Sequence, residues 1–412
     1  MLDDRLSTLD TVCWVMDRKV RPLDFTVILH SPAMPGIERL RTAATSARNR
    51  YPVTRSRTDG RRWIPLPQPA AAVEPVVVSS ETASSHALQE FVDTPFDLRM
   101  QEPVRQIVVT GAGDSVLATR FHHASADGAS AAMWLTHQLR GAYADEPQSA
   151  AISFRSPALR EGTSNGRRRA VAERPSTEMW HRPKRASRAR CWYTIEFFGA
   201  ALRRRSRERR EFTYNDILTT ITLEVLLRWN RIHRGDDTRV GLWLPVNIRH
   251  AGSSEFGNGT GRVRVHAQYP DNAPFMAKCR SVHAETSHAM RDREWAVSAD
   301  HLLMQLPRWL MAPALRSYLG RRSADLGTAT FSHVDQWSGE PREFFDRVTR
   351  IECVGPLHAR HCLTIAGVSH GDRTWLTFTY DPAQLTRADV EELAAMYRDQ
   401  IAVAQRELSC AA

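Results

Sequence analysis

The chain has 412 residues, which is more than one ordinary hydrophobic core accommodates, so we expect two domains. Its six cysteines are scattered without CxxC spacing, which argues against a zinc site or a disulfide framework and fits a reducing compartment. The net charge is +10, and basic residues are concentrated in two segments, 151–190 and 203–210, without a pattern of interleaved aromatic residues, so we do not expect binding to nucleic acid.

The N-terminal residues and the longest apolar run differ from the patterns of a signal peptide and of a membrane-spanning helix. Met1-Leu2-Asp3-Asp4-Arg5 is charged and differs from a secretory signal peptide. No uninterrupted apolar run reaches 18 residues, and the nearest candidate, 296–315, contains charged and polar side chains. We therefore expect a soluble, cytoplasmic protein without a membrane span.

The first hundred residues alternate between helical and extended patterns. Ser7-Thr8-Leu9-Asp10 can cap a first helix, and residues 25–29 are typical of a strand. Residues 35–50 have helical spacing, which ends before Pro52 because the residue preceding a proline avoids the α region. Residues 76–78 predict a short strand, and 84–92 a helix.

The most informative stretch is Arg120-Phe121-His122-His123-Ala124-Ser125-Ala126-Asp127-Gly128. Before it, the apolar runs 105–110 and 115–121 are joined by a Gly/Asp cluster, which predicts a hairpin. After it, apolar residues recur at helical spacing: Ala131, Leu135, Leu139 and Ala142. Two histidines therefore end a strand, and an aspartate and a glycine open a helix.

The two histidines cannot have the same surroundings. Successive strand residues point to opposite faces, so one imidazole can be exposed while the other is buried or hydrogen-bonded sideways. Asp127 suits an N-cap, and Gly128 permits a close backbone approach. An imidazole titrates near pH 6.5 and can accept a proton from a hydroxyl or an amine. Paired histidines are also common as core residues or metal ligands, and at this point both alternatives stay open.

Residues 151–190 are rich in Arg, Ser, Pro and Gly and predict an exposed basic linker between an N-terminal lobe, 1–150, and a C-terminal lobe, 191–412. A second basic cluster covers 203–210. Either cluster could attract an acidic partner or phosphate groups, or could simply be solvated. The second lobe predicts a helix that starts at Asn215, a closing helix over 387–408, and strands at 192–198, 239–246, 262–266, 328–333, 352–354, 363–369 and 375–380.

Residues 122–128 resemble the HHxxxDG signature of the condensation-domain superfamily. This superfamily includes chloramphenicol acetyltransferase, nonribosomal peptide condensation domains, polyketide-associated acyltransferases and wax ester synthases. Further stretches resemble it in the same order: Leu6-Ser7-Thr8-Leu9-Asp10, Pro95-Phe96-Asp97-Leu98, Pro103-Val104-Arg105, Asn215-Asp216-Ile217-Leu218, Pro245-Val246-Asn247-Ile248-Arg249, Phe256-Gly257-Asn258 and Phe378-Thr379-Tyr380-Asp381.

The resemblance implies an α/β fold of two chloramphenicol acetyltransferase-like sandwich lobes that form a V around a central channel. It implies that His123 is catalytic and that His122 is structural. Asp127 would hold the turn by a bidentate pair with Arg249, and the Gly128 amide would face an oxyanion. Asn247, Asn258, Ser332 and His333 are candidates for the channel lining, although a loop-capping or core role suits each of them equally well.

The function implied is transfer of an acyl group to a hydroxyl or amine, as in natural-product or complex-lipid biosynthesis. The donor would be a thioester of phosphopantetheine on an acyl or peptidyl carrier protein, or of coenzyme A, and no bound cofactor or metal is expected. The acceptor would be a small molecule. The "PLW" motif of wax ester synthases is absent, which argues against a long-chain alcohol acceptor. Two alternatives remain: a catalytically silent adaptor that recruits a carrier protein, and a cyclising or epimerising variant.

Overall fold

The computed structural model describes residues 4–17, 21–66, 73–111, 113–143, 177–182, 184–235, 239–250, 255–292, 327–335, 337, 342–358 and 361–410, with a few single positions between 306 and 317. The chain divides into two compact units. Unit 1 comprises Met1–Arg160, Arg249–Gly259 and Gln336–Pro356, and unit 2 comprises Glu161–Ile248, Thr260–Asp335 and Leu357–Ala412.

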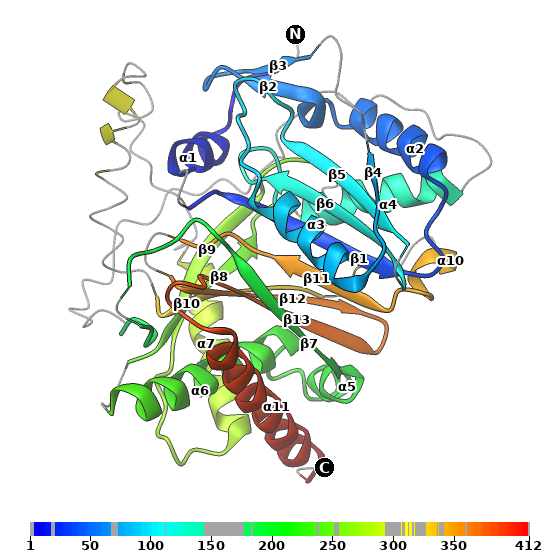
Figure 1. The fold of residues 1–412 in the computed structure, drawn as a ribbon. Coiled ribbons are helices and arrows are strands. Elements are labelled where there is room, and N and C mark those ends of the chain that lie inside the picture. Colours follow the sequence, from blue (N-terminus) through cyan, green and yellow to red (C-terminus); the bar gives the residue numbers. More distant parts are fainter. Residues whose placement is uncertain are drawn as a thin grey trace. The chain divides into compact units, whose positions relative to one another are not determined.

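Unit 1 is built on a five-stranded sheet in the order β11-β1-β6-β5-β4 (Figure 1). The central strand β6 runs antiparallel to both of its neighbours, and β4 is parallel to β5. Val, Ile, Leu and Phe side chains dominate β1, β5 and β6, which are buried along most of their length, as a central position in a sheet requires. The strands are β1 (Asp24–Ser31), β4 (Glu74–Val77), β5 (Val104–Thr110), β6 (Ser115–His122) and β11 (Arg350–Val354).

Helices cover this sheet. The buried side of α4 presents Trp134 and Leu135, and the indole of Trp134 meets the ring of Phe121 from β6 edge to face at 5.8 Å. Close packing of α4 against α2 uses small residues, since a Cβ on Gly141 would lie 3.4 Å from that of Ala43. The elements are α1 (Thr8–Met16), α2 (Ile37–Arg50), η1 (Pro52–Arg55), α3 (Glu81–Asp93), α4 (Gly128–Tyr143) and α10 (Arg342–Phe345), with a small hairpin of β2 (Ser56–Thr58) and β3 (Trp63–Pro65).

Unit 2 contains a six-stranded sheet in the order β7-β13-β12-β10-β8-β9 (Figure 1). Strand β10 is parallel to β12 and β8, and the remaining pairs are antiparallel. The strands are β7 (Cys191–Phe198), β8 (Gly241–Asn247), β9 (Thr260–His266), β10 (Ala329–Val334), β12 (Leu363–His370) and β13 (Arg373–Tyr380). The helices are α5 (Ala200–Arg209), α6 (Tyr214–Arg234), α7 (Phe275–Arg291) and α11 (Arg387–Cys410).

The long helix α6 is central to unit 2 and packs against α5, α7 and α11. A capping box of Thr213 and Asp216 opens it, and Gly235 ends it with a positive φ of 76°. Fully buried Trp229 and Tyr397 contribute large apolar surfaces from α6 and α11. The capping box fixes the first turn of α6, where Asp216 lies.

The predicted α/β fold class is confirmed, and so are the hairpin β5–β6 and the two strands β12 and β13, which pair with each other. The predicted lobe boundaries differ from the observed units, because two segments of the C-terminal half, 249–259 and 336–356, cluster with unit 1. Strand pairing explains part of this, since β11 extends the unit 1 sheet beside β1. The V-shaped placement of the lobes and the channel between them stay predictions.

The basic clusters have different outcomes. Most of the expected linker, residues 151–176, lies outside the described residues. The second cluster forms α5, where Arg203 is buried, donates to the carbonyl of Gly371 at 2.7 Å and lies 3.4 Å from Asp335. At least that arginine is therefore structural.

Within the described part of the chain, no helix combines the length and apolar character that crossing a bilayer requires. The same residues hold no group of three or more His, Cys, Asp or Glu side chains arranged to bind a metal ion.

Candidate active site

The end of β6 places the two histidines differently, as the alternation of strand side chains predicts. His122 pairs with Asp24 across the sheet and is 1% exposed. His123 follows β6, and its N–H donates to the carbonyl of Leu23, the residue before β1, at 2.9 Å, but His123 is only half-buried. The turn that follows reaches α4 within five residues.

His122 holds the turn through its ring and its main chain. Its Nδ1 accepts the N–H of Ala124 at 3.0 Å, so the ring proton sits on Nε2, which lies 3.5 Å from the carboxylate of Asp17. Its carbonyl accepts both the N–H and the hydroxyl of Ser125, each at 2.9 Å. These contacts bind His122 into the turn; its role as structural support of an active site stays a prediction.

His123 is held at its backbone, and the residue as a whole is half-buried. The imidazole lies against the ring of Phe25, with centroids 4.7 Å apart and planes at 45°. The side-chain amide of Asn258 donates to the His123 carbonyl from the far side of the turn. The main chain of residue 123 is therefore fixed from two sides, which limits the directions that its imidazole can take.

Asp127 and Arg249 form the predicted bidentate ion pair. The two guanidinium nitrogens of Arg249 lie 2.8 and 2.9 Å from the two carboxylate oxygens of Asp127, and both side chains are buried. The carboxylate also accepts the N–H groups of Ser130 and Gly259, each at 2.9 Å. Burial alone would raise the pKa of Asp127, but the charge and hydrogen bonds of Arg249, with the two amides, outweigh it and hold that pKa below its usual value.

The other donors of Arg249 clamp the glycine-rich segment that follows it. Arg249 donates to the carbonyls of Glu255 at 3.2 Å and Gly257 at 2.6 Å, and to the hydroxyl of Ser130 at 2.9 Å. The hydroxyl of Ser130 donates to the Gly257 carbonyl at 2.8 Å. A Cβ on Gly259 would come within 2.6 Å of the Arg249 side chain, so only glycine fits there.

Asn258 connects the histidine turn to the first helix. Its amide nitrogen lies 2.9 Å from Oδ1 of Asp10, whose other oxygen completes the capping box of α1 with Ser7. Burial raises the pKa of Asp10. The sequence predicted Asp10 only as a cap and Asn258 as a channel candidate. In the structure Asn258 is buried and holds main chain, so the loop-supporting alternative describes it better.

The remaining candidates are Gly128, which directly follows Asp127, and three residues of unit 2. Gly128 is the first residue of α4 and is partly exposed, so its part in stabilising an oxyanion stays a prediction. Asn247, Ser332 and His333 belong to unit 2, at the end of β8 and in β10. The ring of His333 is hydrogen-bonded to Ser369 at 2.9 Å, and burial, with the nearby charge of Arg203, lowers the pKa of His333 to about 3. His333 is half-buried and its ring is held within unit 2, so its place in a channel stays a prediction.

Sequence reasoning missed three contributors: Asp17, Phe25 and Ser130. Asp17 follows α1, Phe25 is an ordinary strand residue, and Ser130 resembles any small helix residue. Their parts depend on neighbours distant in the chain, so no local pattern could reveal them.

No family model and no curated protein sequence matches the chain. Solved structures do match over nearly its whole length. The cyclization-docking bidomain of the nonribosomal peptide synthetase EpoB from Sorangium cellulosum aligns with a TM-score of 0.72 at 13% identity, over 98% of this chain and 85% of that one. The starter condensation domain of rhizomide synthetase RzmA, in complex with C8-CoA and Leu-SNAC, gives 0.66 at 14% identity, over 98% and 94%.

A wax ester synthase/diacylglycerol acyltransferase from Marinobacter aquaeolei VT8 aligns with a TM-score of 0.60 at 13% identity, over 98% of this chain and 99% of that one. Condensation domains and an acyltransferase thus share one fold with this chain, which is the fold that the resemblance implied. The chain has the fold of the condensation-domain superfamily.

Proposed function

We propose that the protein is a condensation-type acyltransferase in which the imidazole of His123 accepts the proton that the acceptor loses. The observation that carries this proposal is the contrast at the end of β6: His122 is buried and its ring is bonded within the turn, while the neighbouring residue His123 is only half-buried and its backbone is held in place.

The buried ion pair supports this role indirectly. Asp127 and Arg249 do not need to touch a substrate; they fix the turn that carries His123 and the segment that carries Asn258. A catalytic side chain must be held close to its productive geometry, and rigid support from such contacts achieves this.

The reaction proposed joins an acyl thioester to an amine or hydroxyl. The nucleophile attacks the carbonyl carbon, a new C–N or C–O bond forms, and the C–S bond breaks to release a thiolate. The imidazole of His123 accepts the proton that the nucleophile loses, and the thiolate is protonated in turn. General-base help of this kind contributes about 10²–10⁴-fold.

The donor proposed is a thioester of coenzyme A or of a phosphopantetheinylated acyl or peptidyl carrier protein. In support, the related starter condensation domain was solved with C8-CoA, and the EpoB relative carries a docking domain beside its cyclization domain. A role in natural-product or complex-lipid biosynthesis is part of the proposal, as is a cytoplasmic location, which rests on the scattered cysteines.

The test compares wild type, His123→Ala and His86→Ala, which removes an exposed histidine on α3. Each protein is incubated with octanoyl-CoA or an octanoyl carrier protein and a panel of amines and alcohols, and thiol release and product mass are measured. We expect His123→Ala to lose at least about 100-fold in rate with an unchanged melting temperature, and His86→Ala to match wild type. Equal rates in wild type and His123→Ala would refute the proposal.

A further inference from the structure

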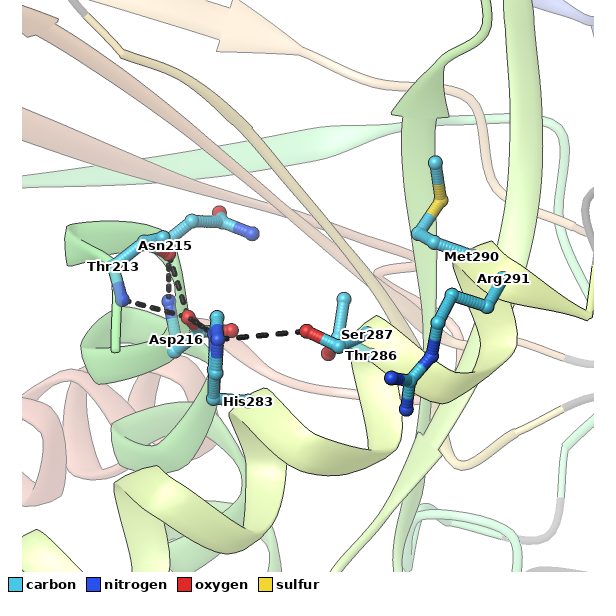
Figure 2. Close-up of a pocket in the computed structure, with 8 residues that line it drawn as sticks. All are labelled: Thr213, Asn215, Asp216, His283, Thr286, Ser287, Met290 and Arg291. Atoms are coloured by element: carbon cyan, nitrogen blue, oxygen red, sulfur yellow. Dashed lines mark hydrogen bonds and ion pairs between the residues drawn. The ribbon is translucent and has the colours of Figure 1, made fainter. Parts of the chain in front are cut away.

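A second group of reactive side chains lies in unit 2, where the start of α6 meets α7. A cavity of about 430 Å³ opens there, lined by residues from both helices (Figure 2). Asp216 contributes from the first turn of α6, and His283 and Ser287 come from successive turns of α7. The role proposed for His123 uses none of these residues.

The three side chains are arranged in series. Nδ1 of His283 lies 2.8 Å from Oδ2 of Asp216, and Nε2 of the same ring lies 3.4 Å from Oγ of Ser287. Figure 2 shows the imidazole between the carboxylate and the hydroxyl. A hydroxyl, an imidazole and a carboxylate in this order form the arrangement that activates serine in unrelated hydrolases, and it is recognised by geometry rather than by fold. The 3.4 Å contact is of the looser kind found in sites without substrate.

Asp216 is fixed in a way that suits a partner for His283. It is 3% exposed, and its Oδ2 accepts both the N–H and the hydroxyl of Thr213 at 2.7 Å as part of the capping box. A carboxylate held there directs the imidazole proton onto Nδ1, so Nε2 keeps its lone pair toward Ser287. The side chain of His283 is 39% exposed on the cavity side of this contact.

Two further residues of the cavity indicate a class of substrate. Arg291, one helical turn beyond Ser287, lines the cavity, and no described residue forms an ion pair with it. A guanidinium recognises carboxylate or phosphate groups. Asn215 also lines the cavity, and a side-chain amide can donate a hydrogen bond to a developing oxyanion.

We propose that Ser287, His283 and Asp216 form a second catalytic site that hydrolyses small esters or thioesters bearing an anionic group. Ser287 Oγ attacks the acyl carbon while its proton moves to Nε2 of His283, and the bond to the leaving alcohol or thiol breaks as that group takes the proton. Water then attacks the acyl-serine, releases a carboxylic acid and restores the hydroxyl. Asp216 is a positioning residue, and Arg291 holds the anionic end of the substrate.

The first test is covalent labelling of the full-length protein with an alkyl fluorophosphonate, which reacts with activated serines. Trypsin releases residues 281–291 as one peptide, and fragmentation separates Ser287 from Ser281. We expect the label on Ser287 in wild type and in His123→Ala, and its rate to fall at least about 100-fold in His283→Gln. His288→Gln, which removes a neighbouring imidazole that pairs with Asp292 at 2.9 Å and does not line the cavity, should label like wild type. Label on Ser281, or none on the peptide, overturns the proposal.

The second test measures hydrolysis of p-nitrophenyl succinate against p-nitrophenyl acetate. Ser287→Ala should abolish both activities, and Arg291→Met should raise KM for the succinate ester alone. Asp216→Asn should lower kcat with little change in KM. Loss of the helix cap alone would lower stability and would not affect kcat selectively. Hydrolysis that survives in Ser287→Ala refutes the site. Ester hydrolysis retained in His123→Ala would show that this site works independently of the acyl transfer proposed for His123, so either proposal can fail without the other.

Discussion

Replacing Asp127 by asparagine probes the centre of the candidate active site. The substitution keeps the size of the side chain but removes the charge that Arg249 faces across contacts of 2.8 and 2.9 Å. Arg249 is 4% exposed, so its guanidinium would stay buried without a counter-charge. One of the acceptors for the N–H groups of Ser130 and Gly259 would also be lost.

The expected cost is large because the pair is buried. Removing one partner of a buried ion pair typically costs about 3–5 kcal/mol. For a domain of this size each kcal/mol lowers the melting temperature by roughly 2–4 °C, so Asp127→Asn should melt roughly 6–20 °C below wild type. The matched control is Glu391→Gln, which breaks an exposed pair with Arg387 at 2.7 Å and should cost at most about 0.5 kcal/mol.

The assay is thermal and urea unfolding of the three proteins, repeated across pH. Because the folded-state pKa of Asp127 is lowered, its charge stabilises the fold above the ordinary carboxyl pKa of about 3.9, and this contribution is lost as the pH falls through the folded-state pKa. The deficit of Asp127→Asn should therefore be constant near neutral pH and shrink only below about pH 4. An Asp127→Asn protein that melts like wild type at pH 7 would refute the structural role of the pair.

Two further substitutions test the packing of each unit. Gly259→Ala places a Cβ about 2.6 Å from Arg249 and should cost about 1–3 kcal/mol, whereas Gly36→Ala, with nothing within 4 Å, should be nearly neutral; equal melting temperatures would contradict the close approach. In unit 2, the pKa of about 3 for His333 means that its neutral form is favoured in the folded state, so stability is full above the ordinary pKa near 6.5 and declines as the pH falls toward 3. Urea unfolding of His333→Asn should show a weaker decline between about pH 6 and 4, by at most about 1.4 kcal/mol per pH unit, and an identical slope would show that the ring is not enclosed.

Local patterns were enough for the elements around the histidines. Alternating apolar residues and a Gly/Asp turn predicted β5 and β6, and helical spacing after Gly128 predicted α4, because strand and helix periods are written in neighbouring residues. The same alternation predicted that only one of His122 and His123 would be buried. The pairing of Asp127 with Arg249, 122 positions apart, came from the resemblance to a superfamily and not from any local signal.

Tertiary structure alone decided which distant segments complete each site. Asn258 lies between the Asp10 carboxylate and the His123 carbonyl, and β11 extends the first sheet beside β1. Buried polar groups and strand edges need hydrogen-bond partners, and these partners can be far away in the sequence. The Ser287, His283 and Asp216 series depends on α7 packing against the start of α6, a contact between helices about 70 residues apart. Composition and periodicity predict each helix separately and do not specify which other helix it packs against.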